Sequence, residues 1–198
     1  MSFSVEEIQE EVIENPLFTL QLMPEWKSTN QKEMWDNYLE TLWMPNPNSI
    51  SVKDIDDFVI GTIERSDAKG SIMGGYEKIP VSISINVVNL QNIDASNMVA
   101  YIKTFKKKAK EKIKKEKYLR LSIRESKIIN LDTREYHSMD AEIKHLLTSS
   151  SRGLVINNKI FFTQIKDLIF VYTISYTSYD DLNDAVNLIK EVKYKIEK

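Results

Sequence analysis

The chain has 198 residues, of which 42% are hydrophobic and 28% charged, and this composition fits one soluble globular domain with a sizeable core. Five glycines and five prolines exclude a low-complexity or collagen-like chain, and the lack of cysteine excludes disulfides, cysteine nucleophiles and thiolate metal sites. No run approaches the roughly 18 to 20 apolar residues of a membrane span. We therefore expect a single domain over residues 1–198.

The first segment of the chain is acidic and amphipathic. Ser4 and Glu7 have the spacing of a capping box, and apolar residues follow at helical spacing, so we expect a short helix at about residues 4–14, ended by Asn15 and Pro16. A signal peptide would instead be basic and then apolar. The segment therefore predicts a cytoplasmic protein, or an extracytoplasmic one if a signal or lipid anchor has been removed.

The next stretch begins with a strand and continues into an inserted region. Phe18, Leu20 and Leu22 alternate with polar residues, which is the period of a half-buried strand, and Pro24 stops that strand. The inserted region spans about residues 27–78. Its sequence predicts, in chain order, a helix at 31–43, a strand in DDFVIGTIER and a glycine-rich loop at 66–78.

The rest of the chain is mostly strand. IPVSISINVVNL alternates and leads into a long helix with its N-cap near Asp94 or Ser96, and DDLNDAVNLIKEV predicts a closing helix with Leu182, Val186 and Ile189 inward. YLRLSIRE and VKYKI each predict one further strand. SKIINLDTREYHSMDAEIKHLL predicts two strands, and KIFFTQIKDLIFVYTISYT predicts a pair of strands joined around Lys166-Asp167. Because consecutive strands lack the helical crossovers of a parallel sheet, we expect an α+β fold, a mostly antiparallel sheet flanked by helices.

The most charged stretch is FKKKAKEKIKKEK, residues 105–117, in a chain whose net charge is only -2. On a helix its core-facing stripe is Met98, Ile102, Phe105, Ala109 and Ile113. The opposite side carries Lys106, Lys107, Lys110 and Lys114. Nine lysines and two glutamates give residues 103–117 a charge of +7, which leaves about -9 for the rest of the chain. The run is the solvated face of a core helix, or else it binds an acidic protein, an anionic lipid surface or nucleic acid; the lack of arginine and a pI of about 5.8 argue against nucleic acid.

The sequence contains no recognisable catalytic or cofactor-binding pattern. His137 and His145 lie eight residues apart without a zinc-site spacing, so two unrelated polar positions are the simpler interpretation. The glycine-rich loop at 70–75 lacks the Lys-Ser/Thr end of a P-loop, and the Asp54, Asp56 and Asp57 cluster lacks a second half for acid–base or metal work. We therefore expect no enzyme, no cofactor and no metal.

Aromatic residues gather near the N-terminal third of the chain. All three tryptophans fall within eighteen residues, beside a proline-rich loop. Tryptophan is enriched at binding hot spots, although the rings could equally cover one face of the sheet. The candidate partner-binding residues are Trp26, Trp35, Tyr38 and Trp43.

The order of elements resembles the PsbP-like superfamily. The resemblance is carried by FTLQLMPEWK, by VSISINVVNL leading into a long helix, and by the closing strand, acidic-start helix and short strand at Val192-Lys193-Tyr194. Two departures are Glu25, where glycine is usual after the proline, and the length of the stretch from Lys27 to Lys78. That superfamily includes the extrinsic protein of photosystem II, a Ran-binding nuclear import factor, DcrB-type lipoproteins and chaperones of secreted effectors.

The resemblance implies an antiparallel sheet between helices, an α/β/α sandwich, and non-enzymatic binding of another protein. From it and from the aromatic cluster we expect a protein-binding module, adaptor or chaperone-like, for a secreted or membrane-associated client. The alternative is an electrostatic binder that uses the Lys103 to Lys117 helix against an anionic surface or an acidic protein.

Overall fold

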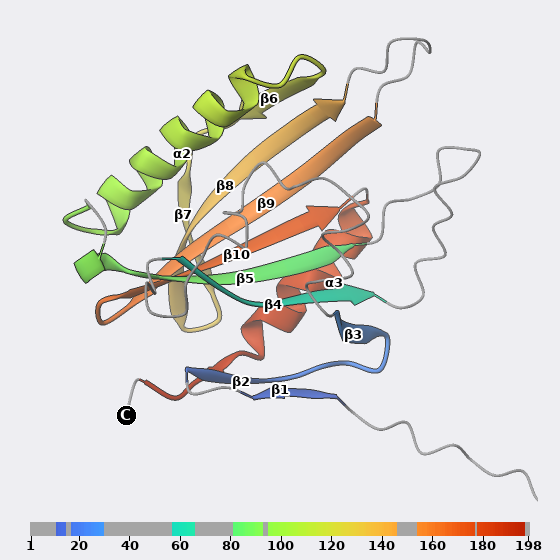
Figure 1. Ribbon diagram of the computed structural model, residues 1–198. Coiled ribbons are helices and arrows are strands. Elements are labelled where there is room, and N and C mark those ends of the chain that lie inside the picture. Colours follow the sequence, from blue (N-terminus) through green and yellow to red (C-terminus); the bar gives the residue numbers. More distant parts are fainter. Residues whose placement is uncertain are drawn as a thin grey trace, which may run out of the picture.

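An eight-stranded antiparallel sheet forms the centre of the computed structural model, which describes residues 11–14, 17–29, 57–65, 81–92, 95–145, 154–176 and 178–196 (Figure 1). Its strands, in spatial order, are β3 (Trp26–Thr29), β4 (Asp57–Arg65), β5 (Ser82–Asn89), β10 (Leu168–Tyr176), β9 (Leu154–Ile165), β8 (Arg134–His145) and β6 (Leu119–Ile123), and β7 (Lys127–Leu131) pairs with β8 beside β6. Every described pairing is antiparallel, so the expected α+β class is confirmed.

A second, three-stranded sheet joins the two ends of the described chain. β1 (Val12–Glu14) pairs with β2 (Phe18–Gln21), and β2 pairs with β11 (Lys193–Tyr194). The helix predicted at about residues 4–14 is therefore wrong at its C-terminal end, and residues 4–10 lie outside the described part. The backbone of Val12–Glu14 forms hydrogen bonds with β2 and not within a helix of its own. The spacing of side chains along one segment cannot reveal this, because strand pairing is a contact between two segments.

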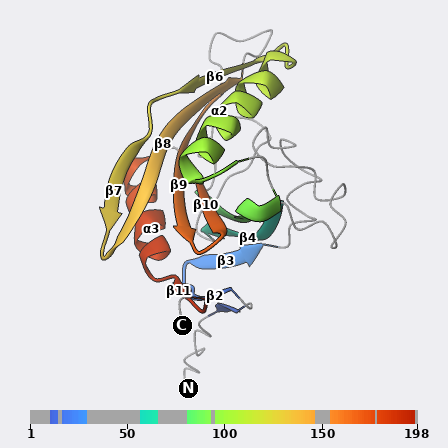
Figure 2. The same cartoon turned by 90° about the vertical axis from the view of Figure 1, so that its left-hand side faces the viewer.

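Two α-helices cover opposite faces of the large sheet, α2 (Met98–Lys114) on one side and α3 (Tyr179–Lys190) on the other (Figure 2). Two neighbouring residues on β9 show why the sheet needs a helix on each face. Phe162 packs in one core cluster with Ile102 of α2, whereas Phe161 packs in another with Leu188 of α3. Successive strand residues point to opposite faces, so both faces are apolar and both need a cover. The described helices and sheet therefore form the expected sandwich.

The strands predicted in the second half of the fold are confirmed to within about three residues, except that β9 begins at Leu154, ahead of the predicted start at Lys159. The β9–β10 hairpin is confirmed. Lys166 stands in its turn with a φ of 54°, and Asp167 follows. The N-cap of α2 is Asn97, not Asp94 or Ser96, and its side-chain oxygen accepts a hydrogen bond from the Ala100 amide at 3.0 Å. A 3₁₀ turn, η2 (Leu90–Asn92), ends the β5 strand.

The core-facing side of α3 is slightly rotated from the expected one. Ile189 is buried as predicted, but Leu182 and Val186 are only half-buried. The fully covered positions are instead Ala185 and Leu188. The small Ala185 side chain allows a close approach of the helix to the sheet, which the apolar spacing alone does not indicate.

Trp26 is a core residue, so its prediction as a partner-binding residue is corrected. It lies at the start of β3 with 1% of its surface exposed, in the cluster that also holds Phe18 and Leu22. Its indole N–H is buried and has no hydrogen-bond partner among the described residues. A ring covered in this way packs the fold and cannot present a face to another protein.

Three tyrosines form a buried group where β11 meets the large sheet. The Tyr172 and Tyr194 hydroxyls are hydrogen-bonded to each other, and the Tyr136 ring packs edge-on to Tyr172 at 6.4 Å. Tyr194 also packs edge-on to Phe170 at 4.9 Å, and the Arg134 guanidinium lies 4.5 Å from its ring centre. Burial raises the pKa of both Tyr172 and Tyr194 well above the ordinary value of a phenol.

We predict that Trp26→Ala lowers the free energy of unfolding by about 3 to 5 kcal/mol, because it leaves a cavity in a closely packed core. Trp26→Phe should cost clearly less, since it keeps an aromatic ring and removes the unpaired N–H. Urea unfolding of the three proteins measures both effects. A cost below about 1 kcal/mol for Trp26→Ala would show that this ring is not in the core.

We predict that the protein loses stability as the pH rises above about 10, the pKa of a phenol in the unfolded chain. There the unfolded state releases tyrosine protons that the folded state retains, so each buried tyrosine lowers the free energy of unfolding by about 1.4 kcal/mol per pH unit. Tyr194→Phe should make this decline shallower, measured by urea unfolding between pH 8 and 11.5. Tyr179→Phe, at a residue that is 78% exposed, should leave the slope of the wild type unchanged.

Candidate functional site

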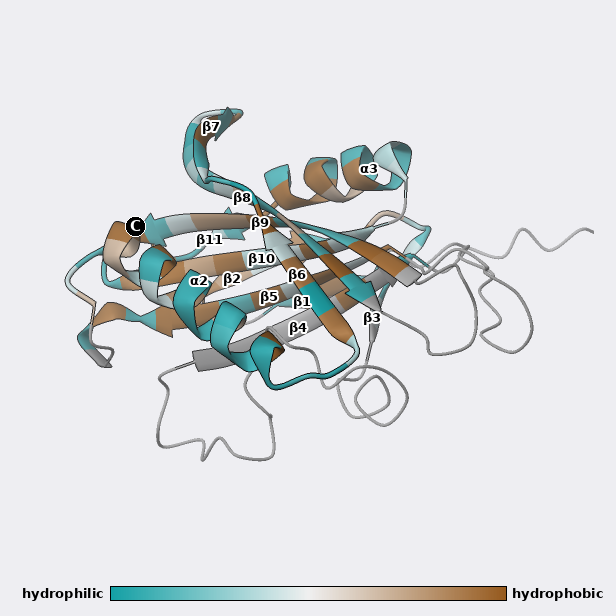
Figure 3. Cartoon of the chain, turned by 90° about the horizontal axis from the view of Figure 1, so that it is seen from above, coloured by the Kyte–Doolittle hydropathy of each residue, from teal (hydrophilic) through white to brown (hydrophobic). Residues whose placement is uncertain are grey.

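The outer face of α2 carries the main charged surface of the described chain. Ile102, Ala109 and Ile113 are buried against the sheet, and Met98 and Phe105 are half-buried, so the predicted apolar stripe is confirmed. The opposite side is exposed and hydrophilic (Figure 3). Of the nine lysines between residues 103 and 117, eight are exposed and Lys106 is half-buried.

The contacts of these lysines leave most of their charge facing water. Lys107 pairs with Glu111 at 3.9 Å, but both side chains are more than half exposed, and such surface pairs contribute little. The Lys106 ammonium lies 3.4 Å from the Ser126 hydroxyl, in the link between β6 and β7. Lys112 and Lys114 stand in the last turn, where cations stabilise the helix dipole. Lys106, Lys107, Lys110 and Lys114, predicted from the sequence as one electrostatic surface, therefore do lie on one helix above the sheet.

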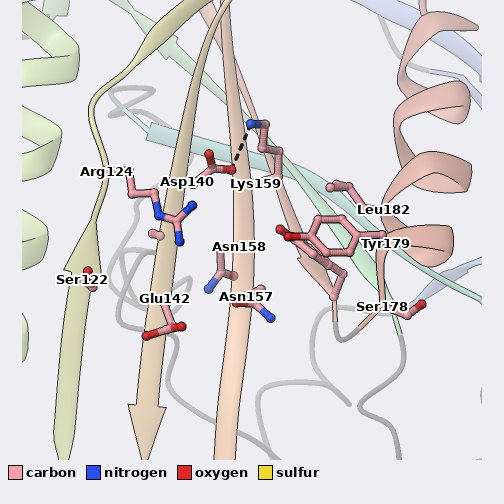
Figure 4. A pocket seen from close by; sticks show the side chains of 12 residues that line it. Ser122, Arg124, Asp140, Glu142, Asn157, Asn158, Lys159, Ser178, Tyr179 and Leu182 are labelled. Carbon is pink, nitrogen blue, oxygen red and sulfur yellow. Dashed lines mark hydrogen bonds and ion pairs between the residues drawn. The ribbon is translucent and has the colours of Figure 1, made fainter.

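A polar hollow of about 270 Å³ lies on the other face of the sheet, beside the start of α3 (Figure 4). Ser122 and Arg124 line it from the β6 side, and Tyr179 and Leu182 line it from α3. Its floor is formed by β8 and β9 with Asp140, Glu142, Asn157, Asn158 and Lys159. The hollow exists because α3 covers only part of this sheet face.

The charges in the hollow are largely compensated by their neighbours. Lys159 donates to Asp140 at 2.9 Å, and Lys144, just outside the hollow, pairs with Glu142 at 3.1 Å. Arg124 is an exposed guanidinium at the rim. Tyr176 lies at the back, and its pKa is raised, first by burial and then by the negative charge of Asp140. Its phenol, protonated at neutral pH like that of any tyrosine, can donate a hydrogen bond.

Asn158 is the most deeply buried polar side chain around the hollow. It is 2% exposed, and its side-chain oxygen accepts from the Ser175 hydroxyl at 2.8 Å, while its amide nitrogen has no partner in the described part of the chain. The sequence analysis did not predict this hollow. The available signal was the alternation of polar residues at Asp140 and Glu142 in β8 and at Asn157 and Lys159 in β9.

The structure separates the two histidines. Both lie in β8, eight residues apart, which corresponds to about 26 Å along a strand, so they cannot share one metal ion. His137 is half-buried, and it pairs with Ile128 of β7 on one side and with Phe162 of β9 on the other. Among the described residues no three His, Asp or Glu side chains gather in a way that could hold a metal.

Several predicted features fall outside the described residues. They are Trp35, Tyr38 and Trp43, the carboxylates Asp54 and Asp56, and the glycine-rich loop at 70–75. Asp57 is the first residue of β4. Within the part of the chain that the structure does describe, no helix is both long and apolar enough to cross a membrane.

Comparisons with known proteins find a likeness in structure. No protein-family model and no curated protein matches the sequence. The solution structure of cyanobacterial PsbP (CyanoP) from Synechocystis sp. PCC 6803 superimposes with a TM-score of 0.52 at 7% identity, and the match covers 98% of this chain and 97% of that one.

A crystal structure of PA94, a protein of unknown function from Pseudomonas aeruginosa, matches less well. Its TM-score is 0.37 at 11% identity, and the match covers 74% of this chain and 84% of that one. The likeness to cyanobacterial PsbP extends over almost the whole of both chains, and at 7% identity it concerns architecture alone. The chain therefore has a PsbP-like fold.

Proposed function

We propose that this protein is a non-enzymatic protein-binding module, adaptor or chaperone-like, and that it holds an acidic partner against the outer face of α2. The observation that carries the proposal is the exposed lysine face of that helix. A charge of +7 between residues 103 and 117 stands on a protein whose net charge is -2. Such an asymmetry attracts and orients an acidic partner before contact.

The packing of α2 favours an acidic protein over a membrane surface. A helix that binds in the plane of a bilayer buries its apolar face among the lipids. The apolar face of α2 is already used, because Ile102, Ala109 and Ile113 are buried under the helix against the sheet. The lysines can then offer only charge, which suits an acidic protein surface.

The polar hollow supports a non-enzymatic role. Its acidic groups are held in ion pairs, Asp140 with Lys159 and Glu142 with Lys144. A carboxylate whose oxygens are engaged by an ammonium group is less free to accept a proton from a substrate. The Tyr176 phenol is suited to hydrogen bonding.

A second candidate surface rests on the sequence. Trp35, Tyr38 and Trp43 share one side of a predicted helix, and aromatic side chains of this kind are enriched at binding hot spots. Because Trp26 belongs to the core, the proposed aromatic surface consists of these three residues alone.

We predict that reversing four lysine charges on α2 releases the partner. The four changes are Lys106→Glu, Lys107→Glu, Lys110→Glu and Lys114→Glu. In a pull-down from native lysate, proteins held by the wild type should be lost from this variant. They should also be lost when salt is raised from about 0.15 to about 1 M, since the Debye length then falls from about 8 to about 3 Å.

The matched control reverses the same number of exposed lysines away from α2, at Lys27, Lys166, Lys190 and Lys193. This control should retain the partner. Equal loss from both variants would show a dependence on net charge alone and would contradict a surface on α2. Binding to phosphatidylserine vesicles that is lost from the α2 variant, with no protein partner lost, would replace the acidic protein with a membrane surface.

We predict that the triple variant Trp35→Ala, Tyr38→Ala, Trp43→Ala retains partners that depend on the lysines. Circular dichroism and urea unfolding first establish that the variant is folded. A partner that this variant loses and the lysine variant retains would move the binding surface to the aromatic residues. Loss of the same partner from both variants would indicate one continuous surface.

A further inference from the structure

Among the described residues, β6 is the last strand of the large sheet, and no described strand pairs with its outer edge. It pairs with β8 through Leu119↔His145 to Ile123↔Ala141, and no described strand lies beyond it. Figure 2 shows β6 at the outer margin of the sheet. An edge strand presents a row of N–H and C=O groups to which another chain can pair.

The hydrogen bonds of β6 show which residues offer these groups. The Arg124 amide donates to the Asp140 carbonyl at 2.9 Å, so Arg124 and the residues two and four before it point their backbone groups toward β8. Leu119, Leu121 and Ile123 therefore point theirs outward. The Leu119 groups are already occupied, since its carbonyl accepts from Arg120 at 2.9 Å and its amide donates to Glu116 at 3.4 Å. Leu121 and Ile123 offer two donors and two acceptors along the edge that make no hydrogen bond to another described residue.

The flank of α2 above this edge is basic. The contact between Lys106 and Ser126 places that flank over the link from β6 to β7. At about 100° per residue, Lys103 and Lys110 lie within roughly 60° of Lys106 around the helix axis. Both are exposed. A row of ammonium groups therefore runs along one side of the open edge.

The opposite side of the same edge is also basic. The side chains of Leu119, Leu121 and Ile123 pack beneath α2. Strand alternation then places Arg120 and Arg124 on the other face, and both are exposed. The unpaired backbone groups of β6 are thus flanked by cations on both faces of the sheet.

We propose that β6 is a strand-addition site, at which an extended acidic segment of a partner protein pairs with Leu121 and Ile123. Its backbone completes the sheet, while its carboxylates reach the α2 lysines on one face and Arg120 and Arg124 on the other. Main-chain hydrogen bonds supply affinity, and alternate side chains supply specificity. This inference rests on the proposed acidic partner and specifies how that partner is held.

A second copy of this chain is a poor occupant of the edge. Pairing β6 with β6 of another copy would bring the two α2 flanks together, each with Lys103, Lys106 and Lys110. Like charges brought together in this way oppose association. An acidic segment instead neutralises the same charges, which is why we choose it.

The test uses a defined probe, a fluorescein-labelled peptide of twelve residues in which glutamate and threonine alternate. Fluorescence anisotropy measures its affinity for the full chain. Two further peptides are compared with it, one with lysine in place of glutamate and one acidic peptide whose central six amides are N-methylated. The wild type should bind the acidic peptide and not the lysine peptide, and N-methylation should weaken binding at least about tenfold because it removes the backbone donors.

Protein variants separate the backbone edge from the charges. Ile123→Pro removes an outward N–H that β8 does not use, and proline is tolerated on an edge strand. Ile123→Ala is its matched control, because it loses the same side-chain packing and keeps the N–H. We expect Ile123→Pro to bind the acidic peptide about fivefold more weakly than Ile123→Ala. Lys103→Glu combined with Lys110→Glu should weaken binding about tenfold.

The outcomes distinguish this inference from the proposed function. Binding of the acidic peptide that is insensitive to N-methylation would overturn strand addition and leave a surface that acts by charge alone. No binding of the acidic peptide would also overturn it, while the pull-down with the α2 variant judges the protein-binding proposal separately. If Ile123→Pro does not fold, the N-methylated peptide against the wild type still decides the question.

Discussion

The structure depends on the burial of both faces of its central strands. β10 has bulky side chains on each face, with Phe170 and Tyr172 on the α3 side and Ile169 and Val171 on the α2 side, all nearly inaccessible. A sheet that is apolar on both faces is stable only when each face is covered. The two helices meet this need, and so their apolar sides are committed to the core.

That commitment decides what the surface can do. α2 has its apolar stripe turned inward, so its lysines form a basic outer face. α3 covers only part of the other sheet face, which leaves the polar hollow at Asp140 and Lys159 beside its first turn. On the described surface, the proposed recognition of a partner therefore rests on charge and on backbone pairing at β6.

Much of the fold could be predicted where the signal is local. The phase of α2 and the β9–β10 hairpin follow from side-chain period and turn residues over a few positions. The short strand β1 could not be predicted, because its apolar residues have helical spacing. Its strand conformation depends on pairing with β2, which is a contact between two segments. Trp26 was predicted to bind a partner but lies in the core. The sequence around a tryptophan in a strand does not indicate whether its ring faces a partner or a neighbouring layer of the same protein.

The sequence by itself determined the α+β class, the basic face of α2 and its inward stripe, because these depend on periodicity and charge within one segment. Only the tertiary structure decided that Arg124, Asp140, Lys159 and Tyr176 meet at one hollow and that the lysine flank stands over the unpaired edge of β6. Strand order and register bring together residues far apart in the chain. No local pattern encodes that order, because it is set by the joint packing of all the strands.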